Sequence, residues 1–142
     1  MRRIFNITSL VTLITAFFLV LLGGFWLLYP YKTTEFPNEP FPILNENKTV
    51  KRGTNIKFMA EFCKVTEIQP TITRIFKNSL LFYTPPMVGN SVPGCYKREI
   101  HVYVPEELPA GKFELQTVYS YQVNPIRNIK VIHSTERFTV TE

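Results

Sequence analysis

The fold is decided by the stretch Thr54-Asn-Ile-Lys-Phe-Met-Ala-Glu-Phe-Cys-Lys64, in which apolar side chains recur at every second position. The even positions from 56 to 62 carry Ile, Phe, Ala and Phe, and the positions between them are mostly polar. Such alternation buries one face of an extended strand and leaves the other face in solvent. The stretch therefore predicts a half-buried β-strand that ends near Cys63.

A partner for this strand is found in residues 95–104, CYKREIHVYV, where the alternation returns. If Cys63 lies opposite Cys95 in an antiparallel pair, the numbers of opposed residues sum to 158. Apolar side chains then face apolar ones, and charged pairs form on the other face. One residue fits less well, because Arg98 points inward. We expect Arg98 at the rim, with its guanidinium in water.

The chain has two cysteines, and this register brings them together. Directly opposed strand residues lie within disulfide range, and an even pair in an oxidising compartment indicates one disulfide. We therefore predict a Cys63–Cys95 bond on the outward face of the two strands. It lacks the spacing of a redox-active pair, so we interpret it as a staple.

Further β-rich runs occupy residues 71–84, 112–123 and 128–141, and turns rich in Pro, Gly and Asn separate them. No segment after residue 29 keeps a helical period. Five or six short strands are typical of an all-β fold, a small antiparallel immunoglobulin-like β-sandwich, which we predict for residues 49–142. A small open barrel is the alternative. We expect this domain to fold alone.

The segment 30–48 is rich in proline, which forbids a continuous helix. Two interpretations stay open for it. It is either an extended stalk or a first edge strand that packs Phe36, Phe41 and Ile43 onto the domain.

Residues 10–29, LVTLITAFFLVLLGGFWLLY, are almost continuously apolar and carry no charge. Twenty helical residues span ~30 Å, the thickness of the hydrocarbon core of a bilayer. We therefore predict an uncleaved signal anchor; a cleaved signal peptide is the rival, but the run is long for one. Expected membrane-interface residues are Arg2, Arg3, Trp26, Tyr29 and Tyr31. By the positive-inside rule, residues 1–9 form a cytoplasmic tail and the β-domain lies in the periplasm or outside the cell.

Few side chains in the sequence suit catalysis or metal binding. The chain has no Asp and only two histidines, His101 and His133, both of which we expect at the surface. No phosphate-binding loop or nucleophile motif is found. The net charge of +5 includes Arg2 and Arg3 and shows no basic run, so nucleic-acid binding is not indicated. We predict no catalytic, cofactor-binding or metal-binding residue. The candidate binding loop is Pro86, Met87, Val88 and Asn90, because loops at sandwich ends often bind.

The runs Leu108–Leu115, Tyr119–Pro125 and Arg137–Val140 resemble the last strands of immunoglobulin-like or fibronectin-III-like ectodomains. Small single-pass membrane proteins of bacteria or their tailed phages look like this chain. The resemblance implies a membrane-anchored, non-catalytic binding or structural module. Its expected partners are the lipid bilayer and another envelope or virion protein. Alternatives are a phage-encoded envelope factor, for lysis or superinfection exclusion, and an enzyme with an unrecognised site.

Overall fold

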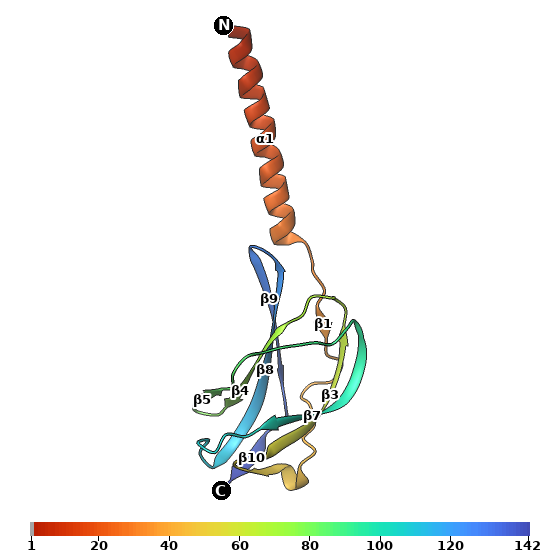
Figure 1. Ribbon diagram of the computed structural model, residues 1–142, viewed down its shortest axis with the longest axis vertical. Helices are drawn as coiled ribbons and strands as arrows, with labels where there is room; N and C mark the ends of the chain where they lie inside the picture. The colour runs from red at the N-terminus through yellow and green to blue at the C-terminus, as the bar shows by residue number, and fades with distance from the viewer. Residues whose placement is uncertain (1) are drawn as a thin grey trace.

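A computed structural model describes residues 2–142, and the side chains from residue 6 onward. It opens with one helix, α1 (Arg2–Leu28), which projects away from the rest of the chain except at its C-terminal end (Figure 1). The 23 residues from Asn6 to Leu28 are long and apolar enough to cross a membrane, and none of this span is buried in the protein. The side chains of Arg2 and Arg3, which we expect at an interface, lie outside the described part.

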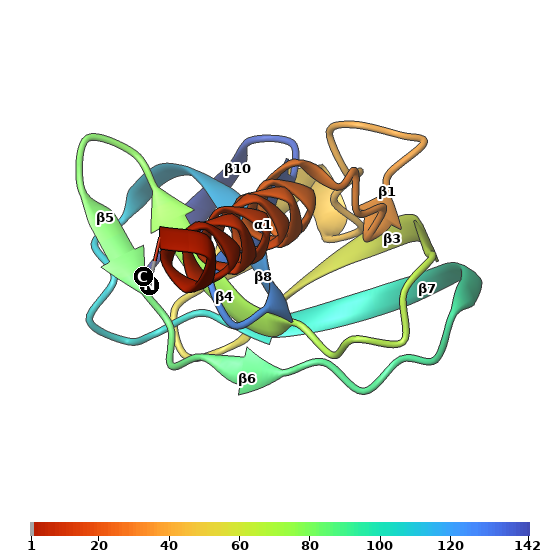
Figure 2. The same ribbon diagram turned by 90° about the horizontal axis from the view of Figure 1, so that it is seen from above.

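The rest of the described chain is mostly β-structure. The strands are β1 (Thr34–Glu35), β2 (Thr49–Lys51), β3 (Asn55–Lys64), β4 (Thr71–Lys77), β5 (Leu81–Tyr83), β6 (Met87–Val88), β7 (Gly94–Tyr103), β8 (Gly111–Asn124), β9 (Arg127–Ser134) and β10 (Phe138–Thr141). One sheet has the order β1-β3-β7 and the other β2-β10-β8-β4-β5, while β9 pairs with β8 and β6 with β4. Seen from above, β3 and β7 lie side by side (Figure 2), in a sheet separate from the one that holds β4 and β8.

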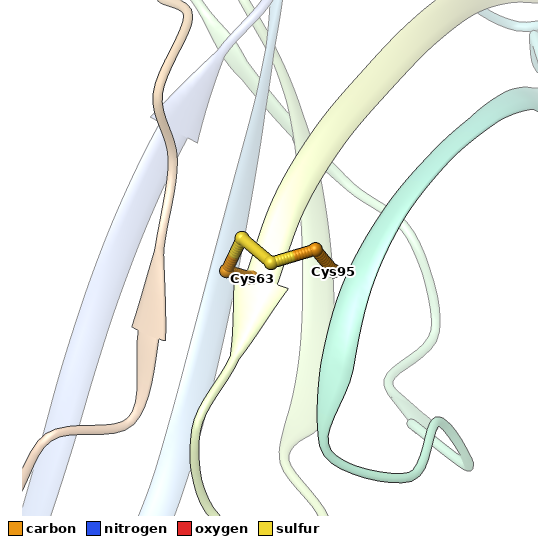
Figure 3. Close-up of a disulfide and its surroundings, with 2 residues drawn as sticks. All are labelled: Cys63 and Cys95. Carbon is orange, nitrogen blue, oxygen red and sulfur yellow. A yellow bond between two sulfur atoms is a disulfide. The ribbon is translucent and has the colours of Figure 1, made fainter.

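The pairing of β3 with β7 has the predicted register, since every opposed pair from Asn55–Tyr103 to Lys64–Gly94 sums to 158. The inward residues of β3 are buried. A disulfide joins Cys63 and Cys95, with their Cα atoms 4.0 Å apart (Figure 3). It lies on the face of the sheet that points away from the core, because the buried residues of β3 alternate with Cys63.

Residues 33–43 are part of the domain and do not form a free stalk. Phe41 is 2% exposed, Ile43 is also buried, and Phe36 packs against the same core. The backbone N–H of Phe41 donates to Ser134 O, and the N–H of Met59 donates to Pro42 O. The segment therefore ties β9 to β3, as the edge-strand interpretation predicts, and the core extends N-terminal to residue 49.

The strand count and one pairing differ from the expectation. The run 71–84 divides into β4 and β5 at a turn, and the run 128–141 divides into β9 and β10. In addition, β2 runs parallel to β10, with Val50 opposite Val140. The other ladders are antiparallel. Residues of both sheets share one buried apolar cluster, which includes Phe58 of β3 and Leu115 of β8.

A candidate ligand-binding cleft between the sheets

A cleft of about 440 Å³ opens between the two sheets, where β7 of one sheet approaches β4, β6 and β8 of the other. Its apolar wall is built from both layers. The residues are Phe62, Ile72, Met87, Val88, Ile100, Tyr119 and Tyr121. The loop Gly89–Ser91, which leads from β6 to β7, completes the rim. This volume and lining are typical of small-molecule sites.

Lys64, Arg74 and Arg98 bring positive charge to the cleft from three different strands. Lys64 is only 4% exposed, and its ammonium donates to Gln69 Oε1 at 2.9 Å and to the carbonyl oxygen of Ser91 at 2.5 Å. Both acceptors are neutral. The ion pairs found among residues 6–142 include none of the three cations.

Arg74 is the least satisfied of these cations. Its Nε is buried with no hydrogen-bond partner among the described side chains, and Nη1 donates to the sulfur of Met87 at 3.3 Å. Burial lowers the pKa of the Arg74 guanidinium and that of the Lys64 ammonium. A buried donor without a partner costs free energy, and none of the three cations has an anionic partner among residues 6–142. The cleft therefore favours a negatively charged group near Arg74.

Arg98 covers the mouth of the cleft from the inward face of β7. Its guanidinium lies 5.1 Å from the ring centroid of Phe62 and 5.0 Å from that of Tyr96, and it donates to Ser91 Oγ. Arg98 is exposed, as expected for a rim position, and its guanidinium both contacts the two rings and remains accessible to water. Below it, burial raises the pKa of Tyr119 to about 12, so this phenol stays neutral.

Only part of this site follows from the sequence. Met87, Val88 and Asn90 of the candidate loop line the cleft, whereas Pro86 is not among the lining residues. The three cations were not predicted as site residues, because they are distant in sequence. Of the three, Arg98 could have been suspected from the sequence, because it is the charged residue on an otherwise apolar strand face.

The two histidines differ in their surroundings. His101 is exposed as expected, on the outward face of β7, and its Nε2 lies 2.7 Å from Glu99 Oε1. The expectation for His133 is wrong, because its side chain is buried at 1% exposure against Phe36 and Phe41. Residues 33–43 fold over it, and this packing was not predictable from strand periodicity. Within residues 6–142, no group of three or more metal-ligating side chains is found.

Burial lowers the pKa of His133, although nearby Glu39 partly offsets this. The unfolded chain therefore binds a proton that the folded chain resists, so stability should fall as pH drops below ~6.5. Replacing His133→Phe should make the free energy of unfolding, measured by urea titration, less dependent on pH between pH 7.5 and 5.5. A wild-type slope in His133→Phe would contradict this.

Hydrogen bonds lower the pKa values of Glu114 and Glu136, and these two groups therefore affect the pH dependence of stability only below pH ~4.5.

The chain matches no family model and no curated protein. Among solved structures, it is similar to a Niemann-Pick type C2 protein from the Japanese carpenter ant, at 10% identity and a TM-score of 0.44. The match covers 77% of this chain and 98% of that one. A likeness at this level assigns neither a family nor a ligand.

Proposed function

We propose that this chain is a membrane-anchored, non-catalytic binding module. In this proposal α1 crosses the bilayer with its N-terminus in the cytoplasm, and the β-domain, an immunoglobulin-like sandwich, is displayed outside. The apolar span Asn6–Leu28 supports the anchor. The disulfide supports an oxidising compartment for the domain.

The proposed ligand is a small molecule that joins an anionic group, phosphate or carboxylate, to a short apolar chain. The single observation that carries this is the set of Lys64, Arg74 and Arg98 around an apolar cleft, none of which forms an ion pair within residues 6–142. The one carboxylate among the lining residues, Glu99, pairs with His101 on the outward face. The apolar wall would cover the alkyl chain of the ligand, and each CH₂ group buried there would contribute ~0.8 kcal/mol to binding.

Hexyl phosphate is a suitable probe, because it is water-soluble and carries both chemical parts. With the full chain in lipid nanodiscs, it should shift the methyl NMR resonances of Ile72 and Ile100 saturably. Hexylammonium should not, and inorganic phosphate should bind more weakly because it lacks the chain. Equal binding of hexylammonium would refute the role of the cations.

The variants Arg74→Gln and Arg98→Gln should each weaken hexyl phosphate binding by about 10- to 100-fold, because a charge-assisted hydrogen bond contributes ~1.5–3 kcal/mol. Lys97→Gln is the matched control. It removes the same charge one residue away, on the outward face of β7, where Lys97 only meets Glu61 at 3.6 Å. An equal loss in Lys97→Gln would indicate general electrostatic attraction and not a site.

A further inference from the structure

The turn between β8 and β9, Asn124-Pro-Ile-Arg127, is hydrogen-bonded to the end of α1; we call these four residues the hairpin tip. The side-chain amide of Asn124 donates to the carbonyl oxygen of Trp26 at 2.8 Å, and Arg127 Nη1 donates to that of Tyr29 at 2.6 Å. Figure 1 shows the tip reaching up to the end of the helix. Carbonyls at a helix C-terminus lack intrahelical partners, so these donors satisfy groups that would otherwise need water.

A cation also suits this position for electrostatic reasons. The C-terminus of a helix carries partial negative charge, which the Arg127 guanidinium opposes. The same guanidinium lies 5.8 Å from the ring centroid of Tyr31, a cation–π contact. Tip and helix end are therefore joined by contacts to Trp26, Tyr29 and Tyr31, three residues of the predicted membrane interface.

The depth of the tip follows from the length of the helix. The apolar span Asn6–Leu28 of α1, 23 residues, is ~34 Å long at ~1.5 Å per residue, slightly more than the ~30 Å hydrocarbon core. Its C-terminal end therefore emerges among the lipid headgroups, where Trp and Tyr are favoured. A turn bonded to Trp26 and Tyr29 lies at the same depth. Ile126, at its apex, is 57% exposed within the protein.

We infer that the hairpin tip is a second membrane contact, in which Ile126 enters the headgroup region of the bilayer next to α1. The partner is the lipid bilayer that α1 spans, so the inference rests on the proposed anchor. Together the helix and the tip hold the β-domain at two points, which restricts its tilt against the membrane. The cleft is not involved.

Environment-sensitive labels at two positions test this. Ile126→Cys and Ile132→Cys are a matched pair, because both side chains are 57% exposed and both lie on the β8–β9 hairpin. Position 132 lies six residues further, ~20 Å along an extended strand and away from the helix. Each full-length variant, with the Cys63–Cys95 bond kept oxidised, is labelled with nitrobenzoxadiazole and reconstituted into phosphatidylcholine vesicles.

We expect the label at 126 to emit at shorter wavelength and to be quenched several-fold more by headgroup-nitroxide lipids than the label at 132. Iodide in the buffer should quench the label at 132 more. Adding Asn124→Ala and Arg127→Gln should shift the emission of the label at 126 to longer wavelength, reduce its quenching by the nitroxide lipids and increase its quenching by iodide. Equal responses at both positions in vesicle-bound protein would overturn the inference. Failure of the protein to float with the vesicles would instead overturn the anchor, and the inference with it.

Discussion

Residues 30–142 should form a cooperatively folded domain, whereas residues 49–142, which the sequence alone led us to expect to fold by themselves, should not. The shorter chain lacks β1 and the buried side chains of Phe41 and Ile43, together with Phe36 packed beside them. Losing one buried Phe or Ile side chain costs ~2–5 kcal/mol, and a whole domain is stable by only ~5–15 kcal/mol. Urea unfolding followed by circular dichroism measures this; equal midpoints for the two chains would contradict it.

Point substitutions within residues 30–142 separate this effect from chain length. Phe41→Ala should lower the free energy of unfolding by ~3–5 kcal/mol, because the ring packs against Phe58 and His133. Leu44→Ala is the matched control in the same segment. Its side chain is 43% exposed, so the expected change is within ~1 kcal/mol. A small effect of Phe41→Ala would indicate that the segment is dispensable.

Removing the disulfide should lower stability strongly without changing the fold. The bond closes a loop with a sequence separation of 32, which in the chain-entropy model contributes about 3.7 kcal/mol. The β3–β7 ladder of ten opposed pairs does not depend on the bond. We expect the double variant Cys63→Ser, Cys95→Ser to keep its circular dichroism spectrum while its unfolding midpoint falls.

Reduction supplies the control for this prediction. Cys95 is exposed, so a reductant should reach the bond in the folded wild type and produce the same loss of stability as the double variant. The same reductant should leave the double variant unchanged. A loss of β-structure in the double variant at low temperature would contradict the role of a staple and make the bond a condition of folding.

Some features follow from local pattern. The apolar run 10–29 predicts a helix because, in lipid, a helix is the structure in which a single segment satisfies its own backbone hydrogen bonds. The alternation in 54–64 and 95–104 predicts two strands, and their register follows because a slip of one residue would turn every apolar side chain to solvent. Opposed cysteines then follow from the register. These inferences need only the period of side chains along each strand.

Other features depend on contacts between distant segments, which periodicity does not encode. The sequence left open whether the proline-rich segment 30–48 is a stalk or a strand. Part of it packs onto the domain because a buried site receives Phe41, and this site forms only when β3 and β9 come together. The burial of His133 has the same cause. The cationic cleft needs Lys64, Arg74 and Arg98 from three strands to meet, and the hairpin tip meets α1 across 98 residues of sequence. Local pattern specifies each strand and its faces, whereas packing of the sheets decides which distant side chains share a site.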